Sequence, residues 1–308
     1  MNPKLQRFSQ RPNNRNLSNE DLMRRFLIEE RQREEMEMWR IQIAESQSGR
    51  GSSSVSSGGG GSQSSSSPSP ASFTETGLLL NYDVSNSSSY PGSGNTLSNL
   101  VVSTGSTYNQ IIYNGPAYSS SNGGILVLDG SDDFLAASST INIFNSYGSQ
   151  PPSLFNPSTT PFTMGVWLNP GSLTGTLPIF DIAGNGAGSM IMIFDNLGRF
   201  RFIHRQTFSW SNYSEVGTPN GTVNPNQWYY AVYSNSGGTA KFYLNGNLVY
   251  SAPQIISQAE TYHIAFGIFL DYHSVGTMSL GAGHLYNIEL SSEQILSNFN
   301  YSKSKYGL

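Results

Sequence analysis

The sequence predicts an all-β antiparallel sandwich with a short C-terminal helix, and three observations favour this fold class. Short segments with alternating apolar and polar residues recur through residues 75–308. Turn-forming residues are abundant, with 32 Gly and 15 Pro, and charged residues make up 12% of the chain, against roughly 25% in an average soluble protein. No helical pattern separates the expected strands, so we expect antiparallel rather than parallel pairing.

The strongest strand patterns assign side chains to opposite faces of a sheet. In PFTMGVWLNP (161–170), alternate residues point inward and Trp167 faces the other side. RFRFIHR (199–205) places Phe200, Phe202 and His204 on one face and its arginines on the other, which makes His204 a core histidine. WYYAVYS (228–234) is aromatic on both faces, as in a central strand that is covered on both sides.

Two segments predict hairpins. KFYLNGNLVY contains Asn245-Gly246, a pair that accepts the positive φ angles of a tight primed turn. IFDNLGRF is expected to turn at residues 195–198.

The chain ends in a strand, a helix and a polar tail. We expect the last strand at about 278–287. Ser291 and Gln294 then form a capping box, the signature of a helix start. Ile295, Leu296 and Phe299 share one helical face, which we expect to close an open end of the sandwich.

The N-terminal quarter differs from the rest in charge and composition. Residues 1–17 form a basic arm, residues 18–46 read as a helix, and residues 47–74 are a Ser/Gly-rich linker. The apolar residues at the two ends of the helix need cover, so we expect it to anchor the chain to another protein or to a second copy; a helix folded back on the β domain is the alternative. The candidate anchoring residues are Phe26, Leu27, Met36, Trp39 and Ile43.

Composition excludes several classes. The chain has no cysteine, so it forms neither disulfides nor thiolate metal sites. The N-terminal residues lack the apolar core of a secretory signal, and no apolar run is long enough to span a membrane. The net charge of −4 gives no general attraction to nucleic acid.

Four stretches carry a family resemblance. The chain from about residue 77 resembles the laminin-G-like, concanavalin A-like lectin/glucanase family, in the form found in bacteriophage and large-virus structural proteins. The stretches are GLLLNYDVSNSSSYPGSGNTLSNL (77–100), GGILVLDGSDDFL (123–135, similar to a strand pair of the family), PFTMGVWLNP (161–170) and AKFYLNGNLVYSA (240–252). The resemblance implies a concanavalin A-like jelly roll, a fold that hosts lectins, hydrolases, adhesins and spacers alike.

The residues argue against catalysis. Glycoside hydrolysis needs two carboxylates across the scissile bond, and the chain lacks the Glu-x-Asp-x-x-Glu strand that the glucanase relatives use. Asp132-Asp133 is the only adjacent acidic pair in the body, and the resemblance makes it a structural turn. No histidine has the spacing of a zinc site. We therefore expect no enzymatic activity and no obligatory cofactor.

Two loops are candidates for ligand binding. Sugar sites combine aromatic side chains with a few directed polar groups. FSWSNYSE (208–215) and LDYHS (270–274) supply both kinds, although their aromatics could equally cover the core edge or a subunit contact. The ligand-binding candidates are Trp210, Tyr213, Asp271, Tyr272 and His273. The resemblance also implies a calcium site at the rim of the sandwich, with Asp181, taken to end a strand, and Asp271 as weak candidates.

The resemblance to phage and large-virus structural proteins implies a virion structural protein, and the arm, helix and linker agree with such a layout. Residues 1–46 would bind other virion proteins, and the linker would display the sandwich at the particle surface for capsid or tail decoration and for adhesion to host glycans. We expect no membrane or specific nucleic-acid partner, and a homo-oligomer is compatible with the layout. Two alternatives stay open: a purely architectural subunit without a ligand, and a polysaccharide-degrading enzyme.

Overall fold

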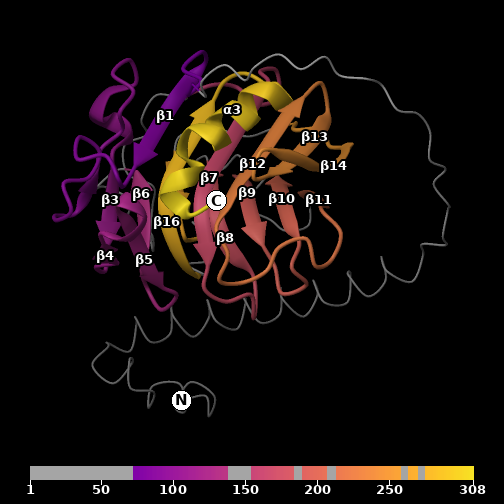
Figure 1. Cartoon of the computed structure of the whole chain (residues 1–308). Coiled ribbons are helices and arrows are strands. Elements are labelled where there is room, and N and C mark those ends of the chain that lie inside the picture. The colour runs from indigo at the N-terminus through magenta and orange to yellow at the C-terminus, as the bar shows by residue number, and fades with distance from the viewer. Residues whose placement is uncertain (1–71, 138–153, 184–188, 207–212, 258–262, 270–274) are drawn as a thin grey trace, which may run out of the picture. The chain divides into compact units, whose positions relative to one another are not determined.

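The computed structural model describes residues 72–137, 154–183, 189–206, 213–257, 263–269 and 275–308 (Figure 1). The expected arm, the anchoring helix with its five candidate residues and most of the linker lie outside these ranges. The described strands form two sheets with antiparallel pairing throughout, which confirms the all-β sandwich.

Sheet A holds eight strands, with β16 at its centre. β7 pairs with one side of β16, and β1 and β5 pair with successive parts of its other side. In the order of the sheet the strands are β14 (Asn247–Pro253), β13 (Thr239–Leu244), β12 (Tyr229–Ser236), β7 (Phe162–Pro170), β16 (Thr277–Tyr286), β5 (Ile125–Asp129) and β4 (Ala117–Ser119), with β1 (Leu78–Asp83) off this path.

Sheet B also holds eight strands, and short helical turns lie in the connections. Its order is β11 (Tyr213–Gly217), β10 (Phe200–Arg205), β9 (Ser189–Phe194), β8 (Leu177–Ala183), β15 (His263–Phe266), β6 (Phe134–Ala137), β3 (Gln110–Tyr113) and β2 (Thr96–Leu97). The 3₁₀ turns are η2 (Gly105–Tyr108), η3 (Ser121–Gly123) and η4 (Lys303–Tyr306).

The main core lies between the sheets and follows the predicted alternation. Phe162, Met164, Val166 and Leu168 of β7 are all fully buried in it. Phe200 and Phe202 of β10 meet them from sheet B, and the Phe202 ring stacks on Tyr233 with centroids 3.6 Å apart. Each aromatic ring buries enough apolar surface to dominate the local packing energy.

Both predicted hairpins are confirmed. Asn245 and Gly246 join β13 to β14 with φ angles of 52° and 81°, as a primed turn requires. β9 turns into β10 where the Gly198 amide donates to the Asp195 carbonyl oxygen at 3.0 Å.

The segment ILVLDGSDDFL differs from the expected strand pair. β5 pairs with β4 and β16 in sheet A, whereas β6 pairs with β3 and β15 in sheet B. The tight turn between them carries the chain from one sheet to the other, held by the Asp129 amide donating to Asp133 Oδ2 at 3.0 Å.

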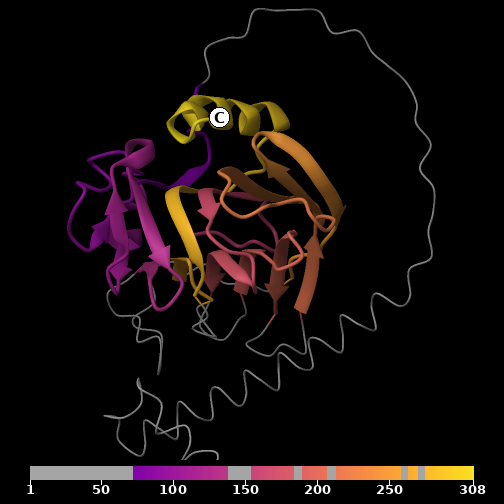
Figure 2. The ribbon, with the colours of Figure 1, turned by 60° about the horizontal axis from the view of Figure 1, so that its bottom comes forward.

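Helix α3 (Ser292–Ser302) begins with the predicted capping box, in which Gln294 N donates to Ser291 Oγ and Ser291 N to Gln294 Oε1. Its predicted position was wrong, because it packs on the outer face of sheet A rather than on an open end (Figure 2). Ile295 is fully buried there, whereas Leu296 is 42% exposed. The cause is the aromatic outer face of the sheet, where the Trp167 ring lies 5.6 Å from that of Phe299.

The body begins slightly before residue 75. Phe73 packs into the cluster beneath α3, and Thr74 N donates to Asn298 Oδ1 at 2.8 Å. Among the described residues, no helix is both long and apolar enough to cross a membrane.

Candidate functional site

The outer face of sheet B is apolar where an antiparallel sheet is usually solvated. Ile191 and Ile193 of β9 and Ile203 of β10 point away from the main core, because they alternate with the core residues of the same strands. All three are at most 2% exposed. In this region sheet B is therefore buried on both of its faces, like the central layer of a fold.

Phe269 and Tyr213 complete this apolar cluster, here called the sheet B cluster. Tyr213 belongs to one predicted binding segment, 208–215, whose described residues begin β11, and Phe269 directly precedes the other segment, 270–274. The structure therefore brings a described residue of the first segment together with the residue that precedes the second. The other four ligand-binding candidates, Trp210, Asp271, Tyr272 and His273, lie outside the described residues.

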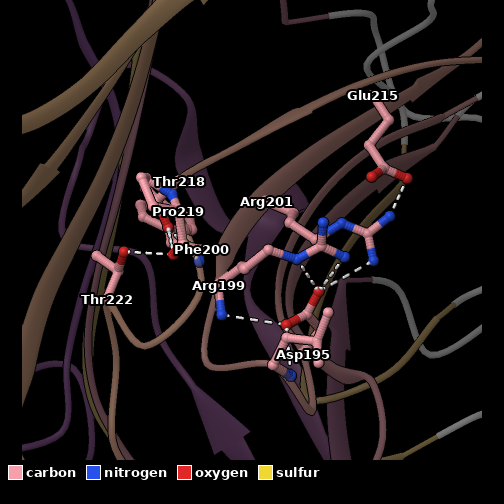
Figure 3. A network of polar contacts seen from close by, with 9 residues as sticks. Asp195, Arg199, Phe200, Arg201, Glu215, Thr218, Pro219 and Thr222 are labelled. Carbon is pink, nitrogen blue, oxygen red and sulfur yellow. Dashed lines mark hydrogen bonds and ion pairs between the residues drawn. The ribbon is translucent and has the colours of Figure 1, made fainter. Parts of the chain in front are cut away.

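A charged network borders the cluster (Figure 3). The Arg201 guanidinium is fully buried and bridges two acids, Asp195 at 3.3 Å and Glu215. Arg199 pairs with the same Asp195 carboxylate at 2.7 Å. Burial is the main cause that lowers the pKa of Arg201 to about 10, and the Arg199 charge adds to this. At neutral pH Arg201 therefore remains charged and needs both acids.

A second row of polar side chains lies beside the cluster. Arg205 is directly opposite Ser189 on one side and Tyr213 on the other. Its Nε donates to Ser189 Oγ at 2.9 Å. His263 follows in the same row across β8, and burial lowers the pKa of its imidazole to about 4, so it is neutral at pH 7. This row thus combines the cationic Arg205 and the neutral His263 with Tyr213, which is partly exposed.

The calcium candidate Asp181 lies inside β8, two residues before its end, where the sequence had suggested a strand terminus. Its side chain is fully buried on the outer face of sheet B, and the residues directly opposite are Ile191 and Ala265. Calcium takes six to eight oxygen ligands, and neither neighbour has a side-chain oxygen. Neither strand neighbour therefore adds a side-chain ligand to Asp181, and the second candidate, Asp271, lies outside the described residues.

Three carboxylates gather at the turn between β5 and β6. Ligand atoms of Asp129, Asp132 and Asp133 lie within 4.8 Å of one another. Asp129 Oδ1 accepts the Ser131 amide at 2.7 Å, and Asp133 Oδ2 accepts the Asp129 amide. These contacts support the reading of this motif as a structural turn.

Most other carboxylates of the described body have structural partners. Asp83 pairs with Lys305 at 3.0 Å, Glu289 with Lys241 at 2.7 Å, and Asp195 and Glu215 with arginines. Within the described ranges each of these four acids is thus engaged in an ion pair. A glycosidase instead needs two carboxyl groups facing each other across a substrate.

Some residues of this region could not be found from sequence. Phe269 stands in the apolar run GIFL, which reads as the continuation of a strand, and Arg201 and Arg205 read as solvent-facing. The only sequence signal that this face is buried was that isoleucines occupy the same side of the strands as the arginines.

Known structures share this architecture. The botulinum neurotoxin serotype G binding domain superposes with a TM-score of 0.51 at 13% identity, over 72% of this chain and 50% of that one. The serotype D binding domain gives 0.51 at 16% identity, over 72% and 51%. Trypanosoma rangeli sialidase gives 0.52 at 14% identity, over 74% and 33%. This chain thus spans about half of the neurotoxin chains that it matches, and the likeness establishes the fold.

Sequence comparison is narrower. No curated protein matches this sequence significantly. The family profile described as the concanavalin A-like lectin/glucanases superfamily, of the laminin G type, matches residues 142–295, which is half of the chain. With its two antiparallel sheets, the chain belongs to the concanavalin A-like lectin/glucanases superfamily.

Proposed function

We propose that the body is a non-enzymatic glycan-binding module, and that its ligand contacts the loops that flank the sheet B cluster. The meeting of Tyr213 and Phe269 in one cluster carries this proposal, because Tyr213 belongs to one of the two aromatic, polar segments and Phe269 directly precedes the other. A sugar site of this kind needs an apolar floor with a few directed polar groups around it. Ile191, Ile193 and Ile203 are themselves buried and form the apolar layer with which Tyr213 and Phe269 cluster.

The engagement of the described carboxylates supports a binding rather than a hydrolytic role. Asp195 holds two arginines and Asp133 holds a turn, so neither is available to donate or abstract a proton at a substrate. Two of the structural neighbours bear titles that call them binding or receptor-binding domains, which agrees with this role.

We further propose that the protein is a virion surface protein. Its basic arm and helix, residues 1–46, would bind other virion proteins, and the Ser/Gly-rich linker would carry the body outward. The support is the layout of the sequence and its resemblance to viral structural proteins. Localisation at the particle surface and homo-oligomerisation belong to this proposal.

The test is binding of the full-length protein to a glycan array and to host cells, with calcium and with a chelator. Tyr213→Ala, Trp210→Ala and Tyr272→Ala remove the three aromatic candidates. Loss of a central aromatic contact costs about 2 kcal/mol, or roughly 30-fold in affinity. Tyr118→Ala is the matched control, because Tyr118 is a similarly accessible tyrosine, 39% exposed, on β4 of the other sheet.

Each outcome decides between the alternatives. Saturable binding that Tyr213→Ala weakens and Tyr118→Ala leaves intact supports the site. Sensitivity to the chelator adds a calcium ion to it. Absence of binding from a folded protein favours a purely architectural subunit, and release of reducing ends from a polysaccharide would establish an enzyme.

A further inference from the structure

Residues 72–74, here called the strap, fasten the start of the body to helix α3. Ser72 N donates to Ser297 Oγ at 3.2 Å, and Ser297 Oγ donates to the Ser72 carbonyl oxygen at 2.8 Å. Thr74 N donates to Asn298 Oδ1 at 2.8 Å. The Tyr286 hydroxyl of β16 also donates to the Thr74 carbonyl oxygen at 3.0 Å. The strap is thus held by side chains of α3 and of β16, and it can lift without breaking any strand pairing.

The Phe73 side chain of the strap covers a buried histidine. Its ring centroid lies 4.9 Å from that of His284 and 5.8 Å from that of Tyr301. His284 stands on the outer face of β16 and is only 5% exposed. Its Nδ1 has no hydrogen-bond partner within the described part of the chain. A neutral imidazole tolerates this environment, whereas an imidazolium would have to keep an unpaired N–H in it.

The groups around His284 do not compensate a positive charge. Asp83 of β1 favours protonation, but Lys305 of η4 opposes it, and the two form an ion pair at 3.0 Å. The phenols on this face of sheet A include Tyr230 of β12, Tyr286 of β16, Tyr301 of α3 and Tyr306 of η4. The same face also carries Tyr243 and Lys241 of β13, and Lys241 pairs with Glu289 at 2.7 Å. Burial is therefore the dominant influence and lowers the pKa of His284 to about 4.

We propose that the strap is an acid-sensitive latch: protonation of His284 expels Phe73 and releases residues 72–74 from helix α3. The released chain would lengthen the segment that leads to the body by about 10 Å, since an extended residue spans about 3.3–3.6 Å. It would also uncover the aromatic rings between α3 and sheet A. The core between the sheets does not include Phe73, so it stays folded.

Linkage gives the size of the effect. His284 has a pKa of about 4 under the strap, against an ordinary value of 6.5 for a solvated histidine, so protonation favours the open state as the pH falls below about 6.5. Between about pH 7 and about pH 5, the opening constant rises by up to roughly 20-fold if opening fully restores the ordinary pKa.

The experiment measures amide hydrogen exchange in the full-length protein at both pH values, as protection factors corrected for intrinsic exchange. The reporters are the amides of Ser72 and Thr74, whose hydrogen bonds break only when the strap lifts. Core amides of β7 report global opening in the same sample. We expect the Thr74 opening constant to rise toward 20-fold while the β7 amides rise far less.

His284→Phe keeps an aromatic ring that cannot be protonated, and it should reduce the rise to below about two-fold. His263→Phe is the matched control: its histidine has a similarly lowered pKa but lies on sheet B, so the rise should persist. His284→Gln provides the same comparison if the phenylalanine variant does not fold. A rise that persists in the His284 variants, its absence from the wild type, or a parallel rise in the β7 amides would overturn the latch. None of these results depends on glycan binding.

Discussion

The buried acid Asp195 provides the sharpest test of the packing on sheet B. Its Oδ1 accepts the amides of Leu197 at 3.0 Å and Arg199 at 3.1 Å, which fixes the hairpin turn. Its Oδ2 binds the guanidinium groups of Arg199 at 2.7 Å and Arg201 at 3.3 Å. Asp195→Ala removes all four contacts, and with them one of the two acids that bind the fully buried Arg201 guanidinium.

The expected cost follows from the burial of Arg201. Removing one partner of a buried ion pair typically lowers stability by about 3–5 kcal/mol, because the other charge remains out of water. Glu215→Ala should cost less, since Glu215 is 22% exposed and Asp195 remains. Glu289→Ala breaks the Lys241 pair, whose side chains are 35% and 28% exposed. An exposed pair of this kind is worth about 0–1 kcal/mol.

Urea denaturation of the full-length variants, followed by circular dichroism of the strands, measures these differences. Arg201→Met in the Asp195→Ala background removes the buried charge that has lost this acid and should restore part of the lost stability. A cost below about 1 kcal/mol for Asp195→Ala, or no recovery in the double variant, would refute the argument that Arg201 depends on this acid.

Three further predictions concern the outer face of sheet A and the buried histidines. Gly281→Ala should destabilise by about 1–3 kcal/mol, because its Cβ would lie 2.3 Å from Tyr306 Oη; an unchanged urea midpoint would contradict this. Ser291→Ala should cost about 1 kcal/mol by removing the cap of α3, and Ser291→Asp, which can still accept the amide, should lose less. Because burial lowers the pKa of His263 and His284 to about 4, their contribution is present above about pH 6.5 and is lost toward about pH 4. Urea midpoints that stay constant over this range would count against it.

The sequence predicts the strands and turns well because those signals are local. Alternation placed Trp167 opposite to the core residues of β7, and Trp167 does face away, stacking on Tyr306 at 4.2 Å. Asn245-Gly246 and Ser291 act within one turn of their own backbone. Such features need no knowledge of distant residues.

Long-range placement was harder to predict. The pattern of α3 shows that one face is apolar but does not show which surface this face packs against. Ile295 could therefore be expected at an open end of the sandwich as readily as on sheet A. The alternation in β10 correctly put Arg201 and Arg205 opposite to the core, yet it could not reveal that this face is also buried. The acid partners of Arg201 come from a turn and a neighbouring strand, and pairing of this kind depends on tertiary register.

The strap and the sheet B cluster lie on different outer faces of the sandwich. The strap, with Phe73, sits on the outer face of sheet A beneath α3, whereas Tyr213 and Phe269 lie on the outer face of sheet B. Packed sheets stand about 10 Å apart, and the main core fills the space between them. The strap and the sheet B cluster therefore lie on opposite outer faces of the sandwich. Release of the strap would leave the sheet B cluster in place, so mutations in the strap should not alter the binding proposed for that cluster, and mutations in the cluster should not alter the latch.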